Sequence, residues 1–166
     1  MAEAEAGSGG AVAAAIKLEE DGRKFYLDSA AKATSDEVSK MFESLAADET
    51  DHIDWLHALA PGVDSSQEAN RALYAKLKTI FSHAPTIRGE ESDTAAIDVA
   101  IGMEERSAKA YAEWAAEGET DEIRKLGTVL VGQERFHQQL LENMKQYLDS
   151  PGDWFLAEER WNFEGG

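Results

Sequence analysis

The chain has 166 residues, 43% of them hydrophobic, which fits one folded domain with a buried core. Its 33 acidic residues outnumber its 16 basic ones, and the formal net charge of -17 disfavours nucleic acid and anionic membrane surfaces as partners. Cysteine is absent, so disulfides, thiolate metal ligands and cysteine nucleophiles are excluded, and any metal site depends on histidine and carboxylate ligands.

The N-terminal half predicts two long helices. Residues 1–10 end in a glycine-rich stretch and are expected to form a flexible leader. Helices are predicted near 11–33 and 36–59, with Ser35 as the N-cap of the second. The start of the chain lacks the basic segment and apolar run of a secretory signal, and no stretch is long and apolar enough to cross a bilayer, so we expect a cytoplasmic protein.

The C-terminal half repeats this pattern after a long link. The link following Pro61 is predicted to contain a short helix of its own. Two further helices are expected near 94–117 and 121–148, separated by Gly118 as a stop and Thr120 as a cap. The aromatic tail, residues 149–166, is expected to pack on the bundle or on a partner. Strand signals are missing, so the predicted fold class is all-α.

An internal repeat relates the two halves. A shift of 85 residues lays AIKLEEDGRKFYLDSAA, from Ala15, on AIGMEERSAKAYAEWAA, from Ala100, and lays SDEVSK on TDEIRK. Two helical hairpins joined by one long crossover favour a ferritin-like four-helix bundle over residues 11–148.

Acidic and histidine side chains interrupt the apolar stripes of all four helices. Residues three and four apart share a helix face, which places four glutamates and two histidines among apolar neighbours: Glu19, Glu49, His52, Glu104, Glu134 and His137. Buried carboxylates need compensating charge, and two divalent ions would balance four of them. The donor set suits iron or manganese, and zinc could substitute. The alternative is that each Glu-x-x-His pair is an ordinary surface pair.

Neighbouring polar residues support weaker assignments. Tyr26 and Tyr111 could hydrogen-bond the carboxylates, although aromatic residues in a helical stripe also serve as core packing. Glu20 and Glu105 adjoin the candidate ligands but should turn away from them. His57 and His83 lack the flanking pattern and are interpreted as surface residues.

At these residues the chain resembles the rubrerythrin-like branch of the ferritin-like superfamily. The resemblance covers roughly residues 11–148 and rests on a glutamate followed seven residues later by tyrosine, and on the segments DETDH and GQERFH. It implies a carboxylate-bridged di-iron centre that reacts with oxygen or peroxide, held by the six residues named above, with Glu49 and Glu134 bridging. In this family a further glutamate stands where this chain has Ser107, and a cysteine-based rubredoxin module delivers electrons. A separate electron-donor protein is therefore expected here.

These observations predict a cytoplasmic di-iron oxidoreductase, of the peroxidase type associated with oxidative stress, that reduces hydrogen peroxide or oxygen. The same six residues would act catalytically through the metals. Two alternatives remain open: a ferroxidase that serves iron storage, and a metal-stabilised helical adaptor whose tail docks a partner. A homodimer is the expected assembly.

Overall fold

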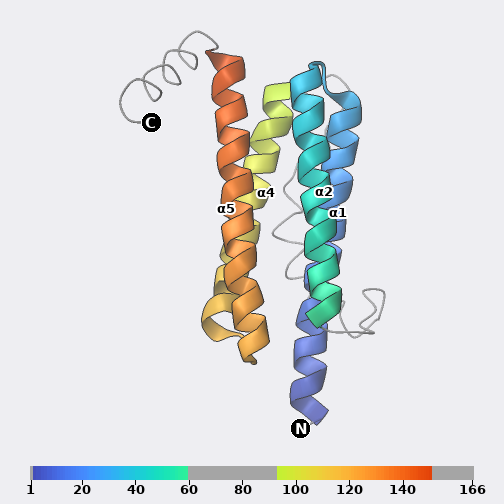
Figure 1. Cartoon of the computed structure of the whole chain (residues 1–166), viewed down its shortest axis with the longest axis vertical. Helices are drawn as coiled ribbons and strands as arrows, with labels where there is room; N and C mark the ends of the chain where they lie inside the picture. Colours follow the sequence, from blue (N-terminus) through green and yellow to red (C-terminus); the bar gives the residue numbers. More distant parts are fainter. Residues whose placement is uncertain (1, 60–92, 151–166) are drawn as a thin grey trace.

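A bundle of long antiparallel helices forms the protein (Figure 1). The computed structural model describes residues 2–59 and 93–150, with only the helical backbone described for residues 2–9. The helices in these ranges are α1 (Ala2–Lys32), α2 (Asp36–Leu59), α4 (Asp93–Glu117) and α5 (Asp121–Asp149). No strand occurs among the described residues, so the prediction of an all-α, ferritin-like bundle is confirmed. The predicted crossover helix and the aromatic tail lie outside the described residues.

Helix boundaries follow the capping residues. The hydroxyl oxygen of Ser35 accepts a hydrogen bond from the backbone N–H of Val38 at 3.1 Å, and that of Thr120 accepts one from Ile123 at 3.2 Å. Both predicted N-caps are confirmed, because each satisfies a backbone donor that the first helical turn leaves free. The N-terminus differs from the prediction: α1 begins at Ala2 and includes the expected leader. Alternating alanine and glutamate favour a helix there strongly enough to outweigh the glycines.

The two hairpins are joined by a carboxylate at one end of the bundle. Helices α1 and α2 form one hairpin, and α4 and α5 form the other (Figure 1). Asp93, the first residue of α4, accepts hydrogen bonds from the turn between α1 and α2: from the backbone N–H and hydroxyl of Thr34 at 2.9 and 2.8 Å, and from the N–H of Ser35 at 3.1 Å. The turn of the first hairpin therefore fixes the start of the second.

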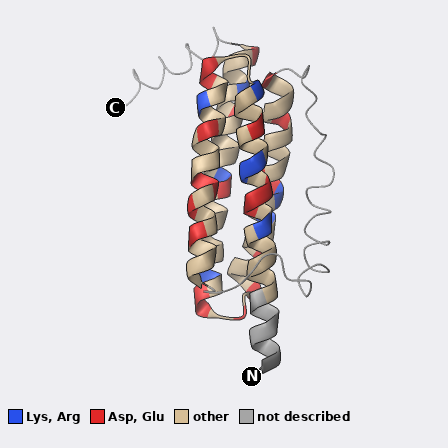
Figure 2. Cartoon of the chain, turned by 90° about the vertical axis from the view of Figure 1, so that its right-hand side faces the viewer, with Lys and Arg blue, Asp and Glu red and all other residues tan. Residues whose placement is uncertain are grey.

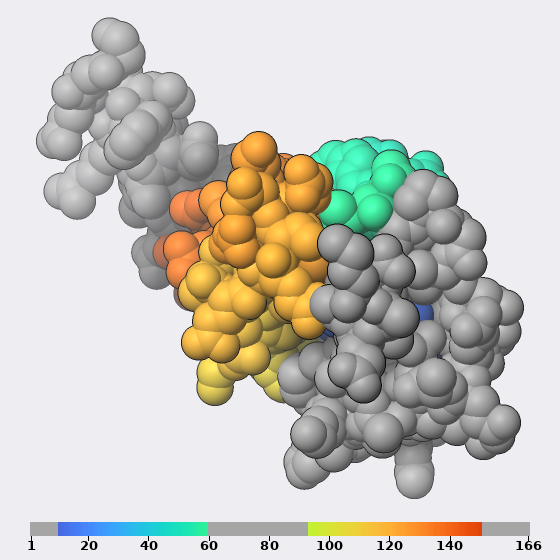
Figure 3. All heavy atoms as spheres, turned by 90° about the horizontal axis from the view of Figure 1, so that it is seen from below, coloured from blue at the N-terminus to red at the C-terminus, as the bar shows by residue number. Residues whose placement is uncertain are grey.

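Apolar side chains fill the bundle on both sides of its polar centre. The cluster nearer the turn between α1 and α2 includes the stacked rings of Tyr26 and Phe42, whose centroids lie 5.8 Å apart. At the other end, Ile16, Leu56 and Leu130 form a second cluster, and there the end of α2 lies beside the beginning of α5 (Figure 3). These two cores leave the middle of the bundle to the acidic and histidine side chains.

The outer surface is charged along its length. Acidic positions occur from one end of the bundle to the other, with basic positions interspersed (Figure 2). None of the helices within 2–59 and 93–150 combines the length and the apolar character that a membrane crossing requires.

Candidate metal centre

The structure brings all six candidate ligands together in the middle of the bundle. Each of the four described helices contributes, and each residue is at most 3% exposed: Glu19 from α1, Glu49 and His52 from α2, Glu104 from α4, and Glu134 and His137 from α5. The convergence follows from the repeat, because each hairpin presents one stripe with a glutamate and one with Glu-x-x-His.

The six residues form two overlapping groups. The first contains Glu19, Glu49, His52 and Glu134, and the second contains Glu49, Glu104, Glu134 and His137. In each group one potential ligand atom per residue lies within 4.8 Å of all the others. Glu49 and Glu134 belong to both groups, and each has two carboxylate oxygens to offer. Two cation positions could therefore share these two carboxylates.

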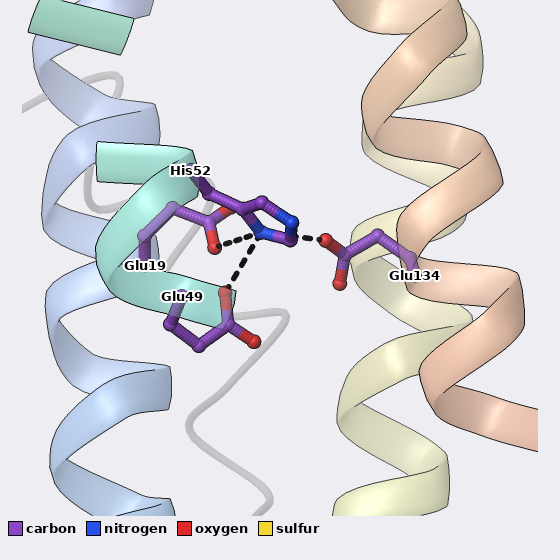
Figure 4. A group of neighbouring side chains, drawn as sticks. All are labelled: Glu19, Glu49, His52 and Glu134. Atoms are coloured by element: carbon purple, nitrogen blue, oxygen red, sulfur yellow. Dashed lines mark hydrogen bonds and ion pairs between the residues drawn. The ribbon is translucent and has the colours of Figure 1, made fainter. Parts of the chain in front are cut away.

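The first group surrounds the imidazole of His52 (Figure 4). Its Nδ1 lies 3.3 Å from Oε2 of Glu19, 3.0 Å from Oε2 of Glu49 and 3.3 Å from Oε1 of Glu134. Three carboxylates from three helices thus converge on one nitrogen. Coordination of a shared cation would use the same atoms.

The second group is looser around its histidine. Nδ1 of His137 lies 3.6 Å from Oε1 of Glu104 and 3.8 Å from Oε1 of Glu49, and no described residue forms a hydrogen bond with it. The rings of His52 and His137 stack with centroids 5.5 Å apart. Each hairpin therefore directs the Nδ1 atom of its own histidine toward the shared glutamates.

The donor atoms fit divalent cations. Oε1 of Glu134 and Nδ1 of His137 are buried at the centre and lack hydrogen-bond partners within the described ranges. None of the four glutamates pairs with a lysine or arginine among the ion pairs of those ranges. Buried charges of one sign are costly unless they are protonated or balanced, and two divalent ions would balance four carboxylates.

Two tyrosines hydrogen-bond the glutamates across the repeat. The hydroxyl of Tyr26 donates to Oε1 of Glu104, and that of Tyr111 donates to Oε1 of Glu19. Hydrogen bonds from both tyrosines to the carboxylates were compatible with the sequence, but the glutamate that each tyrosine meets was not predicted. Each tyrosine bonds the glutamate of the other hairpin, so these bonds also tie the two hairpins together.

The electrostatics of the cluster favour bound protons when cations are missing. Burial, followed by the charges of Glu19 and Glu104, raises the pKa of Glu49 and of Glu134 well above the usual 4.5. Burial alone would lower the pKa of His137, but its interactions with Glu104 and Asp48 raise that pKa overall. Cations would therefore have to displace protons to enter the site.

Asp48 is a contributor that the sequence analysis missed. Its Oδ2 lies 3.2 Å from Nε2 of His137, on the side of the ring that faces away from the glutamates. The available signal was its position directly before Glu49, on the flank of the stripe. The other weighed residues lie apart from the cluster: Glu105 and His57 are exposed and Glu20 is half-buried, whereas His83 lies outside the described residues.

A small cavity adjoins the glutamates between α1 and α4. Its volume is about 10 Å³, and its lining includes Glu19, Glu104, Gly22 and Ser107. Gly22 and Ser107 correspond in the repeat, and both have short side chains that leave this space open. The volume approaches what a single water molecule needs. The cavity therefore lies directly beside the carboxylates of Glu19 and Glu104 and is no larger than one water molecule.

An antiparallel four-helix bundle with glutamates on two helices and Glu-x-x-His pairs on the other two defines the class of ferritin-like carboxylate proteins whose cluster can hold metal. A family model described as Rubrerythrin matches residues 11–145. The chain therefore belongs to the rubrerythrin family, as its resemblance predicted. Searches of curated proteins and of solved structures found no significant match.

Proposed function

We propose that the chain is a di-iron oxidoreductase that reduces hydrogen peroxide or oxygen. The observation that carries the proposal is the pair of four-residue groups that share Glu49 and Glu134. Glu19 and His52 would complete one metal position, and Glu104 and His137 the other. Oxygen and imidazole donors without sulfur suit iron, and manganese or zinc could occupy the same donor set. When bound, two iron ions would supply the electron transfer to the oxidant.

The protein's own residues would hold, orient and shield this centre. Tyr26 and Tyr111 fix the carboxylates of Glu104 and Glu19 by hydrogen bonds, which limits their movement as charge changes. The apolar clusters on both sides exclude bulk water from the bundle centre. Gly22 and Ser107 keep bulky side chains away from the glutamates on the side that faces the small cavity. Electrons would come from a separate donor protein. The proposal includes a cytoplasmic location and a homodimer, both of which rest on the sequence.

A ferroxidase that serves iron storage is the second candidate. It would use the same residues, and the net charge of -17 favours it because an acidic surface concentrates Fe²⁺. The two candidates differ in which oxidant reacts faster with the reduced, iron-loaded protein.

Stopped-flow absorbance after anaerobic loading with Fe²⁺ tests the proposal. The loaded protein is mixed separately with hydrogen peroxide and with oxygen, beside a Glu49→Gln, Glu134→Gln variant. A Glu20→Gln, Glu105→Gln variant is the matched control, because these glutamates adjoin candidate ligands in the sequence but lie outside the cluster. Oxidation of two irons per chain, faster with peroxide and lost only in the first variant, supports the peroxidase.

Each other result favours a different function. Faster oxidation by oxygen favours the ferroxidase. Stoichiometric binding of Fe²⁺ without oxidation by either oxidant favours the metal-stabilised adaptor. Absence of stoichiometric binding refutes the metal centre itself.

A further inference from the structure

The two halves of the candidate metal centre differ in the contacts that the Nε2 atom of each histidine makes. Nε2 of His137 bonds the carboxylate of Asp48 at 3.2 Å, whereas Nε2 of His52 is buried and has no hydrogen-bond partner within the described ranges. In the repeat, Gln133 stands at the position that corresponds to Asp48. The ring of His52 instead lies beside Trp55, with centroids 5.4 Å apart. The six candidate ligands are therefore related by the repeat, but the residues that contact the two histidines from outside the cluster are not.

This difference affects the affinity of each histidine for a cation. An imidazole that binds through Nδ1 must carry its proton on Nε2. For His137, Asp48 accepts that proton's hydrogen bond, which fixes the ring and leaves the Nδ1 lone pair directed at the glutamates. A carboxylate in this place also makes the ligand nitrogen a stronger donor. For His52 the same form leaves a buried N–H without an acceptor, which is unfavourable.

Asp48 can support His137 without adding to the charge problem of the cluster. Its side chain is 41% exposed, whereas the side chains of the four glutamates are at most 4% exposed. Asp48 therefore keeps contact with water and needs no cation to compensate it. Its carboxylate reaches from the surface of α2 to the back of an imidazole on α5.

We propose that the two metal positions are inequivalent and are filled in order. The first cation binds where His137 is the histidine ligand, with Glu49, Glu104 and Glu134, and Asp48 is the positioning residue that makes this position the tighter one. The second cation binds more weakly, where His52 is the ligand. This inference rests on the proposed two-metal function.

Titration of the metal-free protein with Co²⁺ under anaerobic conditions tests the order, with visible absorbance and calorimetry as readouts. Two steps separated by about tenfold or more in affinity are expected. At one equivalent, the large contact shifts that mark a directly coordinated imidazole should appear in the NMR spectrum on the ring of His137, whereas the ring of His52, 5.5 Å away, should show only the smaller through-space shifts. Equal affinities, or contact shifts on His52 at one equivalent, would overturn the inference.

Substitutions at Asp48 and Gln133 test whether Asp48 causes the difference in affinity between the two metal positions. Asp48→Ala should weaken the first step by about 10- to 100-fold and leave the second unchanged. Asp48→Asn, which keeps a neutral acceptor, should recover part of the loss. Gln133→Asp should tighten the second step and narrow the gap. Asp51→Asn is the matched control, because this exposed residue of α2 carries the same charge and lies outside both groups.

Failure of the inference and failure of the proposed function give different results. If Asp48→Ala weakens both steps equally, or neither, the assignment of Asp48 is wrong although the two-metal centre stands. If the unmodified protein binds no Co²⁺ stoichiometrically, the centre itself is wrong.

Discussion

Substitution of Glu134 by glutamine should have opposite effects on stability with and without metal. Glu134 is 1% exposed, its Oε1 has no hydrogen-bond partner in the described part of the chain, and burial with the charges of Glu104 and Glu19 raises its pKa. Glutamine has almost the same shape but no charge. At a pH where the carboxylate is ionised, removing its charge relieves about 1.4 kcal/mol for each unit by which burial raises its pKa. The metal-free Glu134→Gln variant should therefore unfold at higher temperature than the unmodified protein at about pH 8.

Metal should reverse that order. A ligand present at 100 times its dissociation constant stabilises the folded state by about 2.7 kcal/mol, so two such ions contribute about 5 kcal/mol. Glu134 belongs to both groups, and its loss should remove most of this gain. Because about 1 kcal/mol corresponds to about 2–4 °C in melting temperature for a chain of this size, both differences are measurable.

The assay is thermal unfolding followed by circular dichroism, in EDTA and in Zn²⁺, which has no redox chemistry of its own. Glu43→Gln is the control, because it removes one exposed carboxylate from α2 and should change neither curve. A Glu134→Gln variant that melts at a lower temperature than the unmodified protein in EDTA, and whose melting temperature rises as much in Zn²⁺, would refute this prediction.

Three further predictions follow from the same contacts. The pKa values of Glu49 and of Glu134 are raised in the folded protein, so the stabilisation from their protonation is complete below the usual 4.5 and is lost as pH rises through the folded-state pKa. The urea midpoint in EDTA should therefore fall as pH rises above about 4.5; a flat profile would contradict this. Tyr111→Phe should lower the free energy of unfolding of the metal-loaded protein by about 1.5–3 kcal/mol, because it removes a hydrogen bond to a buried carboxylate. A double-mutant cycle in urea should show coupling between Tyr111→Phe and Glu19→Gln. Tyr26→Phe should show no such coupling to Glu19→Gln, because Tyr26 bonds Glu104 instead. Gly127→Ala should destabilise the protein by about 1–3 kcal/mol, because the added methyl group would lie 2.7 Å from the backbone nitrogen of Ala115. Gly132→Ala, which has open space around it, should stabilise the protein by about 0.5–1 kcal/mol. Equal effects of the two substitutions in denaturant unfolding would show that the contact between Gly127 and Ala115 is wrong.

Local patterns in the sequence predicted the helices and the candidate ligands. Ser35 and Thr120 cap α2 and α5 because a side chain next to the first turn satisfies free backbone N–H groups, an effect that depends only on nearby residues. Glu49 and His52 share a helix face because of the helical period, and the repeat gave the same result for Glu134 and His137. The start of α1 differs from the expected one, because alanine and glutamate near the N-terminus favour a helix whereas the glycines that follow them disfavour one.

Only the tertiary structure determined the contacts between side chains on different helices. No sequence spacing could show that Tyr26 would bond Glu104 and Tyr111 would bond Glu19, because the partners are 78 and 92 residues apart and meet only once the two hairpins dock. The link from Asp48 to His137 and the tight contact at Gly127 have the same origin. The sequence by itself determined which side chains face the centre of the bundle, since helical periodicity is local. Only the packing of one hairpin on the other determined which of those side chains touch, because the relative shift and rotation of two helices depend on every contact between them.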